Sequence, residues 1–395
     1  MTFVTRIGAG GAAGPGSGRY SYMHPIGGRT HSRILSSIAF VALVAGSIAV
    51  AAPPVSADAA PELVAAGRAP LRGAAAIARL GERLDNVAAR HHVSDDKLEH
   101  MLRSDATLAV DANEQLVYTE PSVVGVEPAP ESVPPVSATE DDDTFELHSR
   151  PGAPRTIYLD FDGETVTGTG WTGSYTGGSS CYGDAFTTDG DGSTFSSGER
   201  AIIKSVWERV SEDYAPFAVD VTTEDPGAAG IQRTNYLDEE FGTRALITSA
   251  TTVCSNGKTL YQSVCPGGCG GVAWVGVFNY SGWLQDAYQP ALVFNNALSN
   301  SAKNIAEATS HEVGHNLGLS HDGATTGCGS GGLSACSYYY GQNMWAPIMG
   351  VGYNKPVTQW SKGDYSIANN TEDDLAIMQG LELDLRADDH GGDRE

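Results

Sequence analysis

Basic residues are scarce in this chain of 395 residues, which has 24 Lys and Arg against 48 Asp and Glu and a formal net charge of -24 at pH 7. The first 57 residues hold four Arg and no acid, so removing those four positive charges leaves -28 for the remainder. Such a charge repels a phosphate backbone, and we therefore expect no nucleic-acid partner. The hydrophobic fraction of 41% is nevertheless ample for one sizeable domain and a smaller unit.

The chain also lacks a long apolar run. Its apolar stretch Ile38 to Ala52 is shorter than the roughly 20 residues that a membrane-spanning helix needs. Arg29 and Arg33 precede this stretch, and the small residues Val55-Ser56-Ala57 follow it. This order predicts a signal peptide over residues 1–57 and a secreted, extracellular protein with no stable membrane anchor after signal removal. A retained anchor is the alternative.

No cysteine occurs between residues 58 and 150. The cysteines all lie downstream of residue 180, at Cys181, Cys254, Cys265, Cys269, Cys328 and Cys336. An even number in an exported chain predicts disulfides, and many pairings are possible. The short spacing makes Cys328 and Cys336 the first candidates to pair, whereas Cys265 with Cys269 alone is too little for a zinc ribbon.

Two segments precede the first predicted strand. Residues 58–120 carry apolar residues at helical spacing, as around Leu80 and Leu102, and predict a helical propeptide. Residues 121–150 are rich in Pro and acids, a composition that stays solvated and predicts a linker open to proteolysis. A permanent accessory domain is the alternative to a propeptide. At the other end, residues 383–395 are expected to form an acidic tail.

From residue 154 the pattern changes to strands separated by turns. Ser196 and Glu199 form a capping box, which predicts the start of a helix. The predicted strands are alternating or short apolar runs, and they lie at Arg155–Phe161, Val219–Thr223, Thr243–Ser249, Gly271–Phe278 and Ala291–Asn295. This order of elements predicts an α/β (α+β) sandwich.

The most specific motif runs from His311 to His321, reads HEVGHNLGLSH, and matches the pattern H-E-x-x-H-x-x-G-x-x-H at each fixed position. His311 and His315 lie one turn apart on a helix face, so both imidazoles can reach one ion. A straight helix would carry His321 about 9 Å further along its axis. The chain must therefore turn, and Gly318 can adopt the positive φ that ends a helix.

Three neutral imidazoles leave a fourth position on a zinc ion open for water, whose pKa the ion can lower to about 7. Glu312 is next to a ligand on the helix and can take the proton of that water, which suits hydrolysis of a peptide bond. The pattern H-E-x-x-H alone occurs by chance in unrelated helices. The added glycine and third histidine make the metal site the preferred interpretation.

This motif resembles that of the metzincin zinc proteases, and Asp322 after the third histidine makes it most similar to the reprolysin or adamalysin branch. The stretch Ala346-Pro347-Ile348-Met349-Gly350 resembles the Met-turn of that family, which implies that Met349 forms a hydrophobic floor under the ligands. Three further stretches, Ile157–Gly163, Asp213–Phe217 and Gln359–Gly363, are similar to bacterial secreted reprolysin-like proteases.

The resemblance implies a metzincin-type catalytic domain over residues 151–382. Such a domain has a five-stranded mixed sheet, an active-site helix, a Met-turn and a C-terminal helix. It also implies that Gly271–Phe278 is the antiparallel edge strand along which an extended substrate would lie.

The chain departs from that branch in several places. Pro347 and Ile348 stand where the branch usually has a cysteine, so its disulfide pairings are not carried over. Without cysteine in residues 58–150, latency through a propeptide thiolate is excluded for that segment; an Asp or steric cover could serve instead. Tyr353 lies further past Met349 than the tyrosine that some metzincins use near the transition state, so a catalytic role for it is the lesser interpretation.

The sequence therefore predicts a secreted zinc metalloendopeptidase, made as a zymogen, monomeric and active on polypeptides. Its expected residues are catalytic Glu312, the ligands His311, His315 and His321 for one catalytic zinc ion, and the supporting Gly318, Asp322 and Met349. A non-catalytic binding or adhesion module on the same fold is one alternative, against which the intact Glu312 argues. A zinc amidase acting on cell-wall peptides is another.

A second cation is a lesser expectation. Asp184, Asp189 and Asp191 cluster in a Gly-rich loop that could bind calcium. Their spacing is not that of an EF-hand, and a solvated acidic loop is the simpler interpretation.

Overall fold

The computed structural model describes residues 69–120, 122, 143–326 and 336–387. The predicted signal peptide, the linker before residue 143 apart from residue 122, and most of the predicted acidic tail lie outside these residues. Within them, no helix combines the length and the apolar character needed to cross a membrane.

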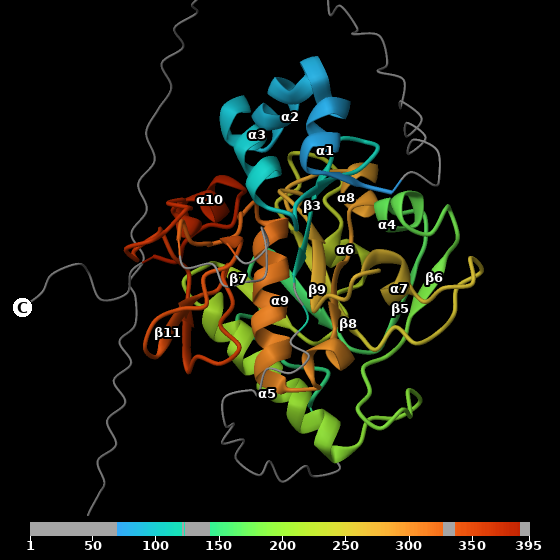
Figure 1. Ribbon diagram of the computed structural model, residues 1–395. Helices are drawn as coiled ribbons and strands as arrows, with labels where there is room; N and C mark the ends of the chain where they lie inside the picture. Colours follow the sequence, from blue (N-terminus) through green and yellow to red (C-terminus); the bar gives the residue numbers. More distant parts are fainter. Residues whose placement is uncertain (1–68, 121, 123–142, 327–335, 388–395) are drawn as a thin grey trace, which may run out of the picture. The chain divides into compact units, whose positions relative to one another are not determined.

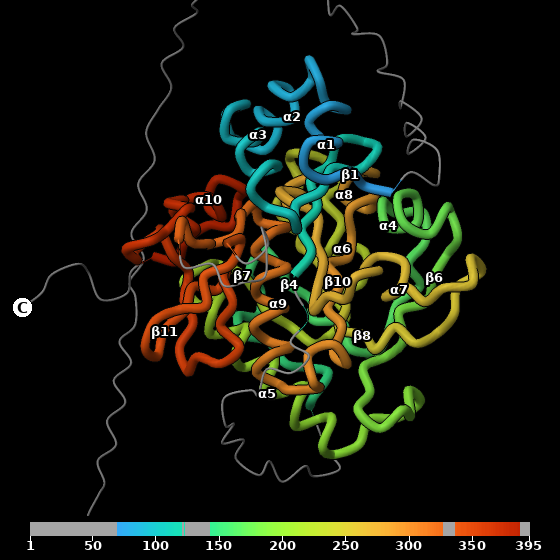
Figure 2. The backbone as a smooth tube through the Cα atoms, viewed as in Figure 1, coloured from blue at the N-terminus to red at the C-terminus, as the bar shows by residue number. Residues whose placement is uncertain are grey.

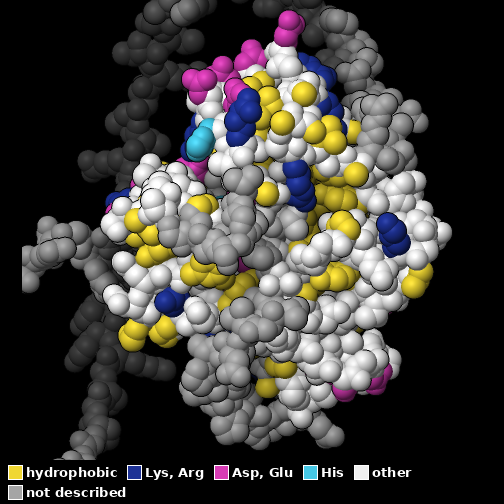
Figure 3. Space-filling model, in the orientation of Figure 1, with side chains coloured by type: hydrophobic (Ala, Val, Ile, Leu, Met, Phe, Trp, Pro, Cys, Tyr) yellow, Lys and Arg dark blue, Asp and Glu magenta, His cyan; other side chains and the backbone are white. Residues whose placement is uncertain are grey.

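The described N-terminal segment, residues 69–120, begins with three short helices, α1 (Gly73–Leu80), α2 (Leu84–Arg90) and α3 (Asp95–Ser104). Ala76, Leu80, Val87, Leu98 and Leu102 are buried in one cluster between them. The face that these helices turn outward carries acidic and basic side chains (Figure 3). This amphipathic pattern is the one that the helical spacing of the sequence predicts.

The same segment then forms two strands, β2 (Ala109–Val110) and β3 (Leu116–Glu120), which the helical pattern did not predict. With the short β1 (Leu71–Arg72) they join the main sheet. Runs this short carry little periodicity of their own, so only their pairing partners reveal them as strands.

The main sheet has eight strands in the order β1-β2-β3-β9-β10-β8-β4-β7. Its C-terminal part consists of β4 (Arg155–Asp160), β7 (Val219–Thr222), β8 (Phe241–Thr248), β9 (Gly271–Trp274) and β10 (Ala291–Phe294). The strands β7, β4, β8 and β10 are parallel to one another, whereas β9 is antiparallel to β10. The predicted mixed α/β fold is confirmed, with five strands from this part of the chain and three from the N-terminal segment.

Strand β9 ends at Trp274 rather than at Phe278. Beyond it the backbone leaves the sheet and bonds to the end of helix α9 (Ala302–Asn316): the Gly276 N–H donates to the His315 carbonyl at 2.9 Å, and the Val277 N–H donates to the Asn316 carbonyl at 2.9 Å. The apolar run Gly271–Phe278 is continuous in the sequence. Only its first half forms the strand, and its second half bonds to the end of α9.

Two long helices cover one face of the sheet. Helix α5 (Ser197–Asp213) begins at the predicted capping box of Ser196 and Glu199 and packs against α9 (Figure 1). Between helices and sheet lies the larger hydrophobic cluster, which takes Ala245 and Ile247 from β8, while Leu246 points into a second cluster on the opposite face. Both faces of the central strands are therefore buried, as expected for parallel strands.

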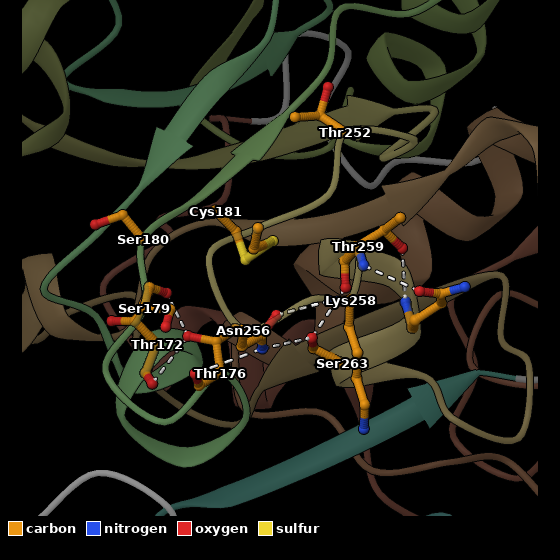
Figure 4. The surroundings of a disulfide bond; sticks show 12 residues. Thr172, Thr176, Ser179, Ser180, Cys181, Thr252, Asn256, Lys258, Thr259 and Ser263 are labelled. Carbon is orange, nitrogen blue, oxygen red and sulfur yellow. Dashed lines mark hydrogen bonds between the residues drawn. A yellow bond between two sulfur atoms is a disulfide. The ribbon is translucent and has the colours of Figure 1, made fainter.

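The opposite face carries a small sheet of β5 (Glu164–Val166) and β6 (Cys181–Gly183) and short helices, α4 (Gly170–Ser174), α6 (Gly227–Ile231), α7 (Leu260–Val264) and α8 (Trp283–Ala287). Cys181 pairs with Cys254, next to the hydrogen bond from the Asn256 amide to the Ser263 hydroxyl (Figure 4). Cys265 pairs with Cys269. Cys328, the predicted partner of Cys336, lies outside the described residues.

The segment that follows α9 completes the fold. After α9 the chain forms β11 (Trp345–Pro347), which pairs in parallel with β12 (Val357–Gln359), and then helix α10 (Asp374–Gly380). The 3-10 turn η2 (Asn295–Leu298) connects β10 to α9. These elements bring residues 346–350 under α9.

Candidate metal centre

Helix α9 carries the first part of the histidine motif. Ser301 caps its N-terminus, and Ile305 and Val313 are buried in the larger hydrophobic cluster. The helix ends before Gly318, whose φ is 88°. A side chain there would be strained and would also meet Leu381 at 3.0 Å. The reversal at Gly318 returns the following residues toward the helix.

The reversal brings three imidazoles together. His311 and His315 project from α9, and His321 comes back so that its Nε2 lies 3.1 Å from Nε2 of His315. The three rings each offer a nitrogen within 4.8 Å of the others, and they form the one candidate metal cluster among the described residues. His311 and His315 are fully buried, and His321 is 5% exposed.

The other ring nitrogens are all hydrogen-bonded. Nδ1 of His311 donates to the Ile348 carbonyl at 2.8 Å, and Nδ1 of His315 donates to the Leu319 carbonyl at 2.8 Å. Nδ1 of His321 instead bonds to Oδ2 of Asp105, at 2.9 Å. A histidine that donates from Nδ1 keeps a lone pair on Nε2, the arrangement that metal-binding histidines share.

The surroundings favour neutral rings. Burial, reinforced by the charge of His321, lowers the pKa of His311 to about 3. Burial followed by the two neighbouring histidines lowers the pKa of His315 well below its usual value. Nε2 of His311 is buried and has no hydrogen-bond partner. Neutral imidazoles whose Nε2 lone pairs face one common position fit a zinc ion.

Glu312 lies beside this cluster. Its side chain is fully buried, and neither carboxylate oxygen has a hydrogen-bond partner. Burial, and secondly the charge of Glu120, raises the pKa of Glu312 well above its usual value. An unpaired buried carboxyl group is costly for stability, so its presence indicates a use at the site.

A glycine makes room for that carboxyl group. A Cβ added to Gly271, at the start of β9, would lie 2.4 Å from Oε1 of Glu312. Gly271 was predicted to lie in a strand, without this role. Its signal was available, because glycine inside a strand often marks a close approach.

Met349 lies under the helix as the resemblance implied. It is fully buried, and a Cβ added to Gly314 would meet its sulfur at 2.7 Å. The carbonyl of Met349 accepts a hydrogen bond from the Asp322 N–H at 2.8 Å. Burial, and secondly Glu372, raises the pKa of the Asp322 carboxyl to about 7. Through its backbone hydrogen bond to Met349, Asp322 connects the end of the histidine motif to the turn beneath the site.

The predicted acidic loop does not form a second cluster. Asp184 accepts hydrogen bonds from the backbone and side chains of Thr251 and Thr252. Asp189 and Asp191 bond to the backbone of their own loop, through the N–H groups of Asp191 and Ser193. The three are not gathered as metal ligands, and the calcium site considered from the sequence is not supported.

Three residues of the N-terminal segment enter the site, and sequence reasoning missed all of them. The Tyr118 ring lies 4.5 Å from the His315 ring and 4.1 Å from the His321 ring, centroid to centroid. Glu120 accepts a hydrogen bond from the Tyr353 hydroxyl at 2.5 Å. With Asp105, these residues come from a segment far away in sequence, and their own neighbours carry no motif.

Residues 234–361 match the family model Reprolysin_5, described as Metallo-peptidase family M12. The match includes the histidine motif and the Met-turn, and it confirms the resemblance to reprolysin-like metzincin metalloproteases inferred from the sequence. No curated protein matches the chain.

Proposed function

We propose that this reprolysin-like chain is a secreted, zinc-dependent endopeptidase, with His311, His315 and His321 as the ligands of one catalytic ion and Glu312 as the general base. The family match supports hydrolysis of peptides by a metal-dependent enzyme. One observation carries the rest: a buried carboxyl group without partners lies beside three buried imidazoles that share a metal-sized space.

A bound zinc ion would supply a Lewis acid that activates water for attack on a carbonyl carbon. Glu312 then accepts the proton of that water on a carboxylate oxygen and donates it to the leaving amine nitrogen. Neither carboxylate oxygen of Glu312 has a hydrogen-bond partner, so both are free to accept that proton. Gly271 keeps the space next to Oε1 free for this exchange.

The substrate would lie along β9. On one side β9 pairs with β10, and its other edge, which carries β3 in this structure, would be free for a substrate once residues 58–120 are removed. An extended peptide can add to such an edge by main-chain hydrogen bonds, with side-chain pockets supplying the preference. This arrangement suits an endopeptidase acting on polypeptides.

The remaining parts of the proposal rest on the sequence and on the disulfides. An N-terminal signal pattern and the pairs Cys181–Cys254 and Cys265–Cys269 support export to an oxidising compartment. Residues 58–120 would be a propeptide, residues 121–150 its linker, residues 151–382 the catalytic domain and residues 383–395 a tail. The mature enzyme would act as a monomer.

The test compares residues 58–395 with the same chain carrying Glu312→Gln, both after removal of the N-terminal segment. We expect one zinc ion per chain in each, and a fall in casein cleavage of about 100- to 10,000-fold in the variant, the range for loss of a general base. If both bind zinc and neither cleaves casein or a varied peptide library, the chain is a binding module. Cleavage of cell-wall peptides alone would indicate the amidase.

A further inference from the structure

We propose that Tyr338 is a further catalytic residue, whose hydroxyl donates a hydrogen bond to the carbonyl oxygen of the peptide bond that is cut. Tyr338 belongs to neither the histidine motif nor the Met-turn. The inference rests on the proposed function, because only a hydrolase that attacks a carbonyl group develops charge on that oxygen.

The carbonyl of Thr119 marks the place of a substrate carbonyl. In this structure β3 lies on the edge of β9 that a substrate would take, with Thr119 opposite Val272 (Figures 1 and 2). The carbonyls of Leu116 and Glu120 accept hydrogen bonds from the β9 side, so the alternation of an antiparallel strand turns the Thr119 carbonyl the other way. An extended peptide that pairs with β9 in the same sense presents a main-chain carbonyl there.

This carbonyl lies between the histidine cluster and Glu312. The residue before it, Tyr118, places its ring 4.5 Å from the His315 ring, centroid to centroid. The residue after it, Glu120, is opposite Gly271, where an added Cβ would lie 2.4 Å from Oε1 of Glu312. A peptide bond at this position therefore has a proposed zinc ligand on one side and the proposed base on the other.

Tyr338 reaches this carbonyl from the side that faces away from β9. Its hydroxyl donates to the Thr119 carbonyl oxygen at 3.0 Å. Its ring lies 4.3 Å from the His321 ring and 6.2 Å from the His311 ring, centroid to centroid. One hydroxyl thus bonds to the main chain directly beside the proposed ligands, where charge would develop on a substrate oxygen.

The residues that hold Tyr338 belong to the proposed catalytic domain. Tyr338 is 2% exposed and packs in the larger hydrophobic cluster. The next residue, Tyr339, donates from its N–H to the Asp322 carbonyl at 2.7 Å and accepts at its carbonyl from the Val351 N–H at 3.0 Å. These backbone bonds do not involve the N-terminal segment, so they would keep the donor in position after that segment is removed.

A second buried tyrosine near the site has a different partner. The Tyr353 hydroxyl donates to the side-chain carboxyl group of Glu120 at 2.5 Å, and not to a main-chain carbonyl. Every polypeptide substrate has main-chain carbonyls, whereas that carboxyl group belongs to the segment that we propose is removed. The geometry therefore assigns the catalytic hydrogen bond to Tyr338 rather than to Tyr353.

The hydrogen bond acts on the charge that moves during the reaction. As the water oxygen bonds to the carbonyl carbon, the electron pair of the C=O π bond moves to the carbonyl oxygen, which becomes negatively charged. The Tyr338 hydroxyl stabilises this oxygen and keeps its own proton. The pair returns when the C–N bond breaks, and Glu312 supplies the proton to the leaving amine. Burial, and secondly the charge of Asp105, raises the pKa of Tyr338 well above its usual value, so the hydroxyl stays protonated at neutral pH.

The experiment compares the chain 58–395 with its Tyr338→Phe variant on one casein-derived peptide, both after removal of the N-terminal segment. We expect kcat to fall by about 100-fold and KM to change by less than about 2-fold, as for loss of one donor to a developing oxyanion. Zinc content and the urea unfolding midpoint should stay close to those of the unaltered chain, because the ring and its packing are kept.

Tyr339→Phe is the matched control. It removes a neighbouring hydroxyl whose hydrogen bond to Gln342 is long, at 3.5 Å, and whose ring stacks on Tyr365 away from the histidine cluster. Its kcat and KM should equal those of the unaltered chain.

Binding measurements separate the transition state from the bound substrate. A phosphinic peptide with the sequence of the cleaved peptide carries a tetrahedral group with charged oxygens at the reacting position. Its affinity should fall in Tyr338→Phe by the same factor as kcat/KM. In the Glu312→Gln background, the affinity for the uncleaved peptide should differ by less than about 2-fold with and without Tyr338→Phe.

The outcomes separate this inference from the proposed function. If the unaltered chain cleaves and Tyr338→Phe cleaves as fast, the inference fails alone. A rise in KM with kcat unchanged would show a group that only holds the substrate, and a loss of zinc would show a structural role; either result contradicts catalysis by Tyr338. An unaltered chain that binds zinc and cleaves nothing contradicts the proposed function, and the inference falls with it.

Discussion

The two helix-borne histidines and the third histidine are held in different ways. His311 and His315 donate from Nδ1 to the carbonyls of Ile348 and Leu319, which belong to the same part of the chain as the motif. His321 bonds to Asp105, 216 residues away in sequence. Two of the proposed ligands are therefore oriented by neighbours within residues 302–387, whereas the third is oriented by a segment that we propose is removed. We therefore expect zinc to bind most tightly while residues 69–120 are present.

The largest expected effect comes from removing one of the two proposed ligands on α9. We expect His311→Ala to lose stoichiometric zinc and all measurable cleavage, both before and after removal of the N-terminal segment, because the remaining histidines leave a two-ligand site. Zinc analysis of dialysed protein and casein cleavage are the measurements. A variant that keeps one zinc ion would mean that His311 is not a ligand, and His148→Ala provides a control outside the cluster.

Gly271→Ala should separate catalysis from metal binding. The added Cβ would meet Oε1 of Glu312 at 2.4 Å, so the carboxyl group must move. We expect zinc to remain and kcat to fall by about 100-fold, the effect of a catalytic group displaced by about 1 Å. The cost in the free energy of unfolding should be about 1–3 kcal/mol, as for an overpacked site. Gly267→Ala, where nothing lies within 4 Å of an added Cβ, is the matched control.

Asp105→Asn tests whether the hydrogen bond from the N-terminal segment to His321 contributes to zinc affinity. In the chain that still carries residues 69–120, we expect the zinc dissociation constant to rise by about 10- to 100-fold, since a carboxylate that orients a ligand histidine is weakened. The measurement is competition with a chromogenic chelator. Ser104→Ala, a neighbouring change on α3, should leave affinity unchanged. Equal affinities for Asp105→Asn and the unaltered chain would mean that the hydrogen bond to His321 does not orient the ligand.

The smallest expected effect is on stability and concerns His148, whose pKa is raised whereas those of His311 and His315 are lowered. Partial burial opposes the charge on His148, but its hydrogen bonds to Glu224 and Asp220 prevail and raise its pKa. A raised pKa in the folded chain stabilises it below the unfolded value of about 6.5, and this stability is lost as the pH rises through the folded pKa.

His148→Gln should therefore lower the free energy of unfolding by about 0.2–1 kcal/mol at pH 5.5 and by little at pH 9. Urea unfolding midpoints at the two pH values provide the measurement. Cleavage at pH 7 should not change, because His148 lies outside the histidine cluster. A loss of stability that is the same at both pH values would contradict the pKa assignment.

Much of the candidate site was already evident in the sequence. The helix, its two histidines and the turn at Gly318 follow from local spacing, because 3.6 residues per turn and one positive φ are local properties. Met349 came only through the resemblance, and its contact with Gly314 gives the physical reason. The strands of the C-terminal part also showed in their apolar runs, although β9 ended early where its backbone turned to α9.

The sequence alone determined which residues are able to hold a metal and supply a base, because side-chain chemistry and helical spacing depend on neighbours in the chain. It did not determine what covers them. Asp105, Tyr118 and Glu120 reach the site only through strand pairing and packing between segments more than 100 residues apart, and these interactions have no local pattern. Only the tertiary structure could decide that the edge of β9 was occupied, because a strand edge is complementary to almost any extended backbone.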